Sequence, residues 1–367
     1  MDSDKRLRAW VRLAAVDGLD SRGVAALLGV FGSPETLLDA APKTLEQYVP
    51  ARLAQAIGGE ADSASGQAIL TWAAEPGNQL LTWDDPDYPR ALLDIGDSPV
   101  LLYYKGRREL LNAPAIAIVG SRNASPSGIK TAEEFAEALA AAGLTVVSGL
   151  ALGIDAAAHR GGLRAGGQGA STIAVIGTGI DRIYPPRNRE LAHRIAAEGG
   201  ILSEFCLATP PLAANFPRRN RLISGLARGV LVVEATLGSG SLITARLAGE
   251  QGREVFAIPG SIHSPFSKGC HKLIKDGAKL VETAQDVLEE LQWASALPAA
   301  ARQAAAPTAI DADSQALLSA LGFDPATPDE LCARLNWKAD RVSALLLQLE
   351  LAGKVAQTPG GRVQRLD

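Results

Sequence analysis

Short apolar runs recur through the middle of the chain, and each is followed by a glycine-rich turn and then by apolar positions at helical spacing. The runs span residues 115–119, 145–147, 172–176, 201–203, 230–233 and 255–258. Strands and helices that alternate in this way predict right-handed crossovers between parallel strands, with helices on both faces of the sheet. The core, from residue 115 to about residue 291, is therefore predicted to be an α/β domain built on a doubly wound, mostly parallel sheet.

The segments before this core have different patterns. Residues 7–74 place apolar side chains at helical spacing between glycines, which predicts a small helical domain of the SAM or helix-hairpin-helix kind. Such domains sometimes bind the DNA backbone, and a packing or partner-binding role is equally consistent with the pattern. Residues 79–106 alternate short apolar runs with turns, so we expect them to add edge strands to the core sheet.

The C-terminal part begins after an alanine-rich stretch at 294–309, which predicts a linker. Beyond it, three helical patterns at 313–321, 327–335 and 338–351 precede a hairpin pattern centred on Gly360 and Gly361, and this order predicts a winged helix. From residue 309 onward the chain has 6 basic and 8 acidic residues, which favours contact with a protein over contact with duplex DNA. The predicted domains are 1–76 (helical), 77–293 (core), 294–309 (linker) and 310–367 (winged helix).

The turns after the strands carry the candidate chemistry. In a doubly wound sheet the carboxyl ends of the strands lie along one edge, where ligands bind. The turns expected there contain glycine and serine and lead into helices whose free N–H groups favour anions. Arg218, Arg219 and Arg221 would repel one another unless a negative group lies opposite, and guanidinium suits phosphate. The residues predicted to bind DNA are Gly120, Ser121, Arg122, Ser148, Gly149, Gly177, Thr178, Arg187, Asn188, Phe216, Arg218, Arg219, Asn220, Arg221, Ser239, Gly240 and Ser241.

Charge limits this interpretation to a local surface. The whole chain of 367 residues has a net charge of −4 and a sequence pI of about 5.7, so it has no overall basic character. Residues 115–291 hold 18 lysines and arginines against 16 aspartates and glutamates, a net charge of +2. Several phosphate-sized sites along one edge suit a polymer better than a mononucleotide, and few base-reading groups suit single-stranded nucleic acid. Phe216 is a candidate for stacking on a base, although packing is the commoner role.

Other functions find less support in the sequence. Cys206, Cys270 and Cys332 are widely separated, so we expect neither disulfides nor a metal site. The N-terminus lacks an apolar signal region and no apolar run is long enough to span a membrane, which predicts a cytoplasmic protein without membrane association. The P-loop and the full dinucleotide fingerprint are missing. We therefore expect no cofactor.

The search for catalytic groups gives four isolated candidates. These are Asp155, His159, Glu204 and Glu234, and they form no recognisable set of acid, base and nucleophile. His159 lies on a helical pattern and is consistent with capping or packing. Glu234, at a strand end, is expected to be a structural hydrogen-bond partner for a neighbouring loop. No residue is predicted to be catalytic.

Taken in order, the motifs of the core resemble the DNA-processing protein A family (DprA, also called Smf). The motifs that carry the resemblance are Gly120-Ser121-Arg122, Ser148-Gly149-Leu150, Gly177-Thr178-Gly179, Tyr184-Pro185, Phe216-Pro217-Arg218-Arg219-Asn220-Arg221, Ser239-Gly240-Ser241 and Gly269-Cys270-His271. The resemblance implies a homodimeric bacterial protein that binds single-stranded DNA on an extended Rossmann-like domain. It also implies protection of incoming DNA during natural transformation and its transfer to the RecA recombinase. The chain departs from the family pattern at Ser127, where a tyrosine is expected, and in the glycine-rich turn at 166–169.

Three functions follow as hypotheses. The first is a non-enzymatic single-stranded DNA binder and recombination mediator, in which Arg122→Ala or Arg219→Ala weakens binding to all sequences alike and flattens its salt dependence. The alternative is a nucleotide or nucleoside-monophosphate hydrolase of the phosphoribohydrolase type, which would depend on Glu234 or Asp155 and prefer mononucleotides. The third is a structural adaptor that binds no nucleic acid.

Overall fold

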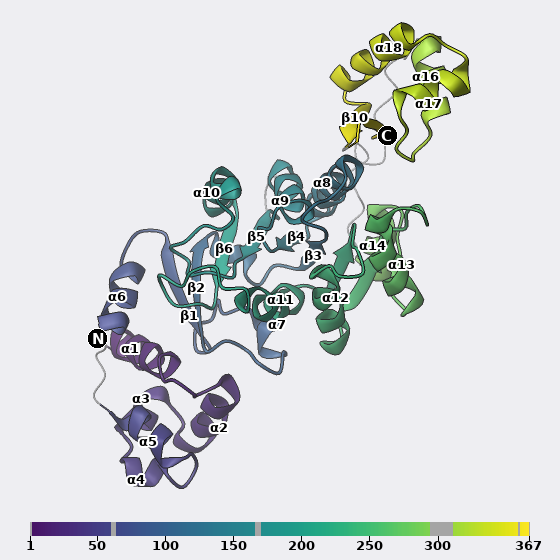
Figure 1. The fold of residues 1–367 in the computed structure, drawn as a ribbon. Helices are drawn as coiled ribbons and strands as arrows, with labels where there is room; N and C mark the ends of the chain where they lie inside the picture. Colours follow the sequence, from purple (N-terminus) through teal and green to yellow (C-terminus); the bar gives the residue numbers. More distant parts are fainter. Residues whose placement is uncertain (1, 60–63, 166–169, 294–310, 359, 367) are drawn as a thin grey trace.

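The computed structural model describes residues 2–59, 64–165, 170–293, 311–358 and 360–366, and one large sheet organises it (Figure 1). The nine strands of this sheet lie in the order β1-β2-β6-β5-β4-β3-β7-β8-β9. Their bounds are β1 Asn78–Thr82, β2 Leu101–Gly106, β3 Ala115–Val119, β4 Thr145–Ser148, β5 Thr172–Val175, β6 Gly200–Ser203, β7 Gly229–Val232, β8 Glu254–Ala257 and β9 Lys279–Leu280.

The strands from β3 to β9 are parallel, which confirms the predicted doubly wound fold. β3 pairs with both β4 and β7, so the strand order reverses direction beside β3. All six strands predicted for the core are present, within one residue at either end. As expected, the segment before the core adds an edge, because β1 and β2 run antiparallel beside β6. The sequence analysis missed β9, which is only two residues long.

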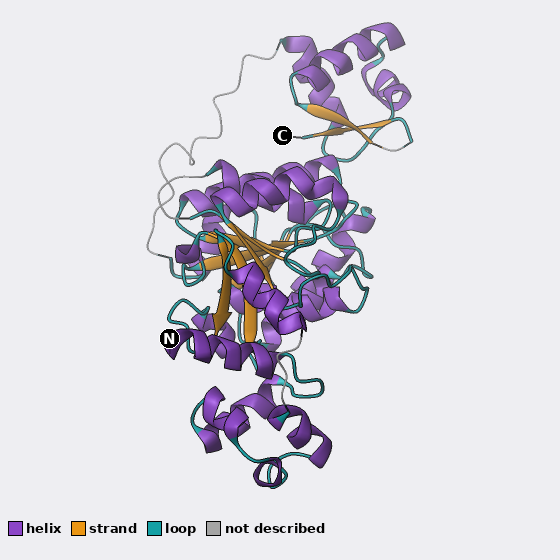
Figure 2. Ribbon diagram, turned by 90° about the vertical axis from the view of Figure 1, so that its left-hand side faces the viewer, coloured by secondary structure: helices purple, strands orange, loops and turns teal. Residues whose placement is uncertain are grey.

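Helices cover both faces of the sheet (Figure 2). α8, α9 and α14 pack on one face through a cluster that includes Phe135, Ala157 and Leu288, while α7, α11, α12 and α13 pack on the other. The bounds are α7 Arg90–Leu93, α8 Pro126–Ala141, α9 Ile154–Arg164, α10 Arg189–Glu198, α11 Asn215–Leu226, α12 Ser241–Glu250, α13 Lys268–Lys275 and α14 Ala284–Glu290. Short 3-10 helices lie at η1 Arg108–Leu110, η2 Pro186–Asn188 and η3 Pro265–Ser267.

One expectation about the arginine cluster is corrected here. The sequence analysis counted residues 218–221 among the turns that follow the strands, but they lie in the first two turns of α11. Pro217 is compatible with this helix, because proline is tolerated in the first turn, where the N–H groups have no intrahelical acceptor. The cluster therefore presents its side chains around a helix, and consecutive residues point in different directions.

The N-terminal part is helical, as predicted. Its helices are α1 Asp2–Ala14, α2 Ser21–Phe31, α3 Pro34–Asp39, α4 Pro42–Leu45, α5 Ala51–Gly58 and α6 Ala64–Ala73. They enclose a core that includes Leu27, Leu37 and Ile57. Val11 of α1 and Ile69 of α6 belong instead to an apolar cluster with strand residues of the large sheet, so these two helices join the helical part to it.

The C-terminal part has the predicted winged-helix order. α16 Ala312–Leu321, α17 Pro328–Leu335 and α18 Ala339–Leu351 precede the antiparallel pair β10 Val355–Thr358 and β11 Arg362–Arg365. A separate core includes Leu318, Leu331 and Val342. The predicted linker 294–309 and the turn 166–169 lie outside the described residues, and the domain boundaries stay a prediction. Among the residues described, no helix is long and apolar enough to cross a membrane.

Candidate nucleic-acid interface

The carboxyl ends of β3 to β8 lie along one edge of the sheet, because these strands are parallel. The sequence analysis predicted this shared edge, and we call the segments that follow the strand ends the carboxyl rim. A cavity of about 690 Å³ opens on the rim and is lined by parts of the connections that follow each of the strands β3 to β8. Its lining includes the predicted residues Gly120, Ser121, Arg122, Phe216, Arg219, Asn220, Ser239, Gly240 and Ser241.

The turn after β3 packs closely against the start of α9 and the end of β7. A Cβ atom on Gly120 would lie 2.6 Å from Ile154 Cγ1 and 2.8 Å from the carbonyl oxygen of Glu234, so only glycine fits there. Gly153 has φ +74°, and a Cβ on it would lie 2.3 Å from the carbonyl oxygen of Ser121. The segments that follow β3 and β7 and the start of α9 therefore meet at this point of the rim.

Glu234 fixes the same turn from the end of β7. Its carboxylate accepts hydrogen bonds from the Ser125 backbone N–H (2.9 Å) and from the Ser125 hydroxyl (2.5 Å). A Cβ on Gly128 would lie 2.3 Å from this carboxyl group, which explains the glycine. Burial raises the pKa of Glu234, while the hydrogen bonds from Ser125 oppose the shift. The predicted structural role of Glu234 is confirmed.

Arg219 lines the rim cavity, but its guanidinium is not presented to solvent as the sequence analysis expected. The residue is 4% exposed, and its Nη1 donates hydrogen bonds to the carbonyl oxygens of Gly149 (2.7 Å) and Val175. A Cβ on Gly149 would lie 2.7 Å from the Arg219 guanidinium and 2.7 Å from Asp155 Oδ2. Gly149 therefore leaves room for a buried cation beside a buried carboxylate. Arg219 ties the ends of β4 and β5 together.

Asp155 and His159 belong to the same internal arrangement. Asp155 accepts a hydrogen bond from the Gly149 N–H (3.2 Å), and burial raises its pKa although Arg219 opposes the shift. His159 Nε2 accepts from the Leu150 N–H (3.2 Å), and His159 Nδ1 lies 2.7 Å from the Thr172 hydroxyl. Burial, aided by the charges of Arg219 and Arg160, lowers the pKa of His159 to about 3. The imidazole is neutral and structural, consistent with the packing role.

Three more of the predicted site residues use their side chains inside the protein. The Ser148 hydroxyl donates to the Ile118 carbonyl oxygen at 2.6 Å, and the Thr178 hydroxyl donates to that of Arg182 at 2.7 Å. The Asn188 amide donates to the carbonyl oxygens of Leu150 (2.8 Å) and Ala151 (3.2 Å). These side chains hold the turns in place and are not presented to solvent. Gly149 and Gly177 are also buried.

A second group of side chains does face outward. Arg122 is exposed, and its guanidinium lies 5.7 Å from the centre of the Phe216 ring. Tyr184, which is 43% exposed, packs on Phe216 with ring centres 5.7 Å apart. Arg187 is exposed in η2. Within the part of the chain that the structure describes, neither Arg122 nor Arg187 forms an ion pair.

Arg218 and Arg221 differ from both groups because they share a carboxylate. Glu204 Oε2 lies 2.5 Å from Arg221 Nη2 and 3.4 Å from Arg218 Nη2. Arg221 also pairs with Asp97, and its side chain is only 12% exposed, whereas that of Arg218 is 61% exposed. Burial raises the pKa of Glu204, and the two arginines oppose this shift. The negative group that the cluster required is thus supplied by the protein itself.

The connection after β7 completes the rim. The Ser239 hydroxyl accepts a hydrogen bond from the Thr236 N–H (3.0 Å), and Gly240 is exposed before the first turn of α12. The Ser241 hydroxyl is buried and has no hydrogen-bond partner among the described residues. Asn220 lies beside this connection, with its amide 3.5 Å from the Gly240 carbonyl oxygen. Residues 239–241 therefore line the same cavity as Arg122.

Sequence reasoning missed two residues at this site. Tyr184 was noted only as part of a motif, although an aromatic residue in an arginine-rich turn was a usable signal for stacking. Asp97 gave no signal, since it is one acidic residue in a turn far from Arg221 in the sequence. No group of three or more potential metal ligands occurs among the residues described.

Comparison with known proteins shows which family has this architecture. The sequence model of the family described as DNA recombination-mediator protein A matches residues 79–292, more than half of the chain. The chain belongs to this family. A second model, the DprA winged helix domain, matches residues 298–361.

Relatives agree with this family assignment. The chain is 44% identical to Protein Smf of Escherichia coli (strain K12) over 303 residues, which cover 81% of this chain and 80% of that protein. It is 52% identical to DNA processing protein DprA of Streptococcus pneumoniae over 209 residues, which cover 57% and 73% respectively. The X-ray structure of DprA from Streptococcus pneumoniae superposes with a TM-score of 0.67 at 40% identity, covering 77% of this chain and 95% of that one.

The solved structure of a further family member concerns DNA binding. DNA processing protein A from Helicobacter pylori superposes with a TM-score of 0.53 at 32% identity, covering 58% of this chain and 96% of that one. That structure is described as showing a single-stranded DNA binding mode.

Proposed function

We propose that this protein binds single-stranded DNA along the carboxyl rim, without catalysing a reaction, and acts as a mediator of recombination. One observation carries the proposal: Arg122, free of any ion pair with a described residue, lies beside the exposed Tyr184 and the half-buried Phe216 at the strand ends of a parallel sheet. A cation beside aromatic rings offers both the phosphate contact and the stacking surface that single strands use. Membership of the family and the DNA-binding mode of the Helicobacter pylori relative support it.

The binding mechanism follows from which groups are available. Arg122 and Arg187 supply charge for the phosphates. Phe216 and Tyr184 supply ring faces, which accept any base. The internal residues, such as Arg219 and Glu234, hold the turns at fixed positions, so that little order has to be gained when DNA binds. Such a surface has limited base selectivity.

The cellular role is proposed from the family rather than from the rim. We propose that the protein is a homodimer in the cytoplasm that protects single-stranded DNA during natural transformation and loads RecA onto it. Sedimentation of the purified chain tests the homodimer. Loading is tested by the rate at which RecA displaces a single-strand-binding protein from DNA, with and without the chain.

The hydrolase alternative has weaker support. Its two candidate carboxylates, Asp155 and Glu234, are engaged with Gly149 and Ser125 in ways that stabilise the fold. Asp155 does line the rim cavity, so a direct test of turnover is part of the experiment below.

A titration separates the hypotheses. A fluorescent oligodeoxynucleotide is titrated with protein at two salt concentrations, with a deoxynucleoside monophosphate as competitor, and the competitor is then assayed for hydrolysis. We expect tight binding that weakens steeply with salt, little competition and no hydrolysis. Preferential mononucleotide binding with hydrolysis would support the enzyme, and no binding of either ligand would support the adaptor.

A further inference from the structure

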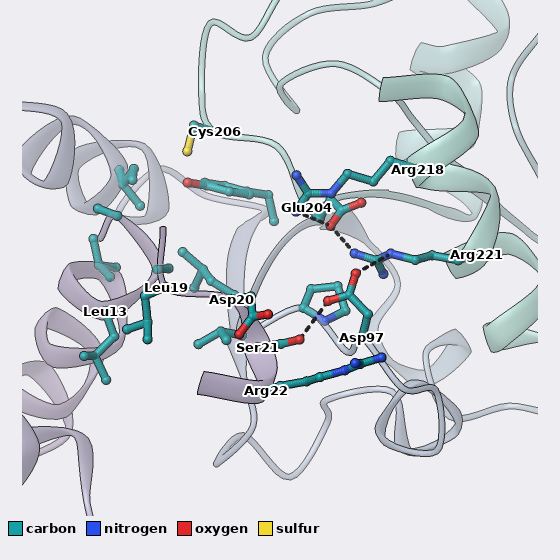
Figure 3. Close-up of a pocket in the computed structure, with 18 residues that line it drawn as sticks. Leu13, Leu19, Asp20, Ser21, Arg22, Asp97, Glu204, Cys206, Arg218 and Arg221 are labelled. Atoms are coloured by element: carbon teal, nitrogen blue, oxygen red, sulfur yellow. Dashed lines mark hydrogen bonds and ion pairs between the residues drawn. The ribbon is translucent and has the colours of Figure 1, made fainter. Parts of the chain in front are cut away.

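A series of polar and charged side chains leads from the helical N-terminal part to Arg218, and Figure 3 shows its members. The Ser21 hydroxyl, at the start of α2, donates to Asp97 Oδ1 at 2.7 Å. Asp97 Oδ2 lies 3.2 Å from Arg221 Nε, and Arg221 Nη2 lies 2.5 Å from Glu204 Oε2. The same Glu204 oxygen lies 3.4 Å from Arg218 Nη2. Carboxylates and guanidiniums therefore alternate along one connected series, which we call the ion-pair path.

The two cations of the ion-pair path differ in their exposure to solvent. The Arg221 side chain is 12% exposed and the Glu204 side chain 2%, so their pairing is sheltered from water. The Arg218 side chain is 61% exposed. It lies on α11 two residues after Phe216, which lines the rim cavity. Of the two arginines, Arg218 is therefore the one that a ligand on the rim can reach.

Glu204 divides its charge between the two arginines. Its shorter contact is to Arg221, but Arg221 also pairs with Asp97 and so does not neutralise Glu204 alone. The Phe205 ring centre lies 5.7 Å from the Arg218 guanidinium carbon, a cation–π contact that keeps Arg218 beside Glu204. Burial raises the pKa of Glu204; the two arginines oppose this shift, and Asp97 adds to it. The charge of Asp97 therefore acts on Glu204 as well as on Arg221.

The helical N-terminal part fixes the position of Asp97. Ser21 donates to the Asp97 carboxylate, and the next residue of α2, Arg22, donates from Nε to the Gly96 carbonyl oxygen at 3.1 Å. Two neighbouring residues of one turn are thus bound by two neighbouring residues of one helix. The side chain of Asp97 is 52% exposed, and these contacts keep it beside Arg221 although water surrounds much of it.

We propose that Glu204 restrains single-stranded DNA binding by competing with phosphate for Arg218, and that Asp97 strengthens this restraint by taking a share of the charge of Arg221. A phosphate gains less from Arg218 while a carboxylate neutralises part of its charge. Glu204 and Asp97 are positioning residues in this account, because they act on the DNA only through the arginines. The inference deepens the proposed function and rests on it for the identity of the ligand.

A double-mutant cycle between Glu204 and Arg218 tests the restraint. Glu204→Gln removes the negative charge and keeps an oxygen that accepts from Arg221. We expect it to raise the affinity for an oligodeoxynucleotide about fivefold, because Arg218 becomes free for a phosphate. Arg218→Ala should then lower the affinity about tenfold in the Glu204→Gln background, against about twofold in the wild type. Fluorescence anisotropy in a salt series measures both, and Glu204→Gln should steepen the salt slope only where Arg218 is present.

A second cycle, between Asp97 and Arg218, tests the contribution of Asp97. Asp97→Asn leaves Arg221 to pair with Glu204 alone, so that Glu204 holds Arg218 less strongly. We expect the affinity to rise about twofold, and the rise to disappear when Arg218→Ala is added. Because the Asp97 side chain is half-exposed, this variant stays folded. If urea unfolding shows that Glu204→Gln does not fold, the cycle with Asp97→Asn decides the proposal.

The control is Glu190→Gln, which removes an exposed carboxylate in the first turn of α10, three residues after Arg187 and outside the ion-pair path. Any gain from it reflects general repulsion of DNA and should be the same with and without Arg218→Ala. Equal gains from Glu204→Gln in the two backgrounds, or no gain in either, overturn the restraint and leave DNA binding on the rim intact. A gain from Asp97→Asn that persists beside Arg218→Ala overturns the part assigned to Asp97. A wild-type protein that does not bind the oligonucleotide rejects the proposed function and the restraint together.

Discussion

Two sets of arginines lie on the same rim and differ in what surrounds them. The clustered residues Arg219 and Arg221 are buried or nearly so, and carbonyl oxygens or carboxylates of the protein occupy their guanidiniums. The isolated residues Arg122 and Arg187 are exposed and form no ion pair with any described residue. Like charges that crowd within one helical turn are stabilised by internal partners, whereas a lone arginine in a turn needs none. On this rim, the clustered arginines Arg219 and Arg221 therefore belong to the scaffold, and the isolated arginines belong to the proposed binding surface.

Among the tests of this contrast, Arg219→Ala has the largest expected effect. Removing the guanidinium leaves the carbonyl oxygens of Gly149 and Val175 without their donor and Asp155 without its neighbouring cation. We expect the free energy of unfolding to fall by about 3–5 kcal/mol, as for other broken buried charge pairs, measured by urea denaturation. The control is Arg194→Ala, which removes an exposed arginine paired only with Glu198 on α10. A variant of wild-type stability with impaired DNA binding would instead restore Arg219 to the binding surface.

The second test uses pH and His159, another member of the scaffold. Its pKa is about 3 in the folded protein against an ordinary value of 6.5, since burial and the facing cations Arg219 and Arg160 disfavour the imidazolium. The unfolded chain therefore binds a proton that the folded protein does not, and stability is lost as pH falls from 6.5 toward 3. Between pH 6.5 and pH 5 this amounts to about 2 kcal/mol. Urea unfolding at pH 7 and pH 5 should show this additional loss in the wild type relative to His159→Gln. Identical pH dependence in the two proteins would rule out the buried neutral histidine.

The third test concerns the binding surface. Arg122→Ala removes an exposed cation that makes no ion pair with the described residues, so stability should not change. We expect affinity for single-stranded DNA to fall about tenfold for all sequences, and the slope of log Kd against log salt to decrease by somewhat less than one. Fluorescence anisotropy at several salt concentrations measures both, with Arg194→Ala as the control of equal charge. An unchanged affinity and slope would remove Arg122 from the interface.

The sequence was sufficient for most of the fold. The six strands of the core are short β-branched or aliphatic runs buried on both faces, and their parallel order follows from the helices between them. The shared rim then follows, because the carboxyl ends of parallel strands lie at the same edge of a sheet. Residues 218–221 were predicted to lie in a turn but lie near the start of α11, which no capping side chain marks. β9, with two residues, is too short to give a pattern.

The site was less predictable because its contacts join distant parts of the chain. Arg219 is separated by 70 residues from the Gly149 carbonyl oxygen that it binds, and no local pattern indicates that Gly149 leaves space for it. The pairing of Arg221 with Glu204 and Asp97 likewise depends on the packing of α11 against the sheet. The sequence therefore predicted that these turns share one edge, but residue type alone could not separate the side chains that support them from those that face outward.

The last test concerns Arg218, which shares one property with each of the two sets of arginines. It is exposed like Arg122 but lies 3.4 Å from Glu204 Oε2, which it shares with Arg221. A guanidinium that is already partly neutralised contributes less to phosphate binding, because the DNA must compete with the carboxylate. We therefore expect Arg218→Ala to weaken single-stranded DNA binding only about twofold and to change the salt slope less than Arg122→Ala does. The two variants are compared on one oligonucleotide in the same salt series. If Arg218→Ala matched or exceeded the loss in Arg122→Ala, clustering would not mark the scaffold, and Glu204 would have to release Arg218 when DNA binds.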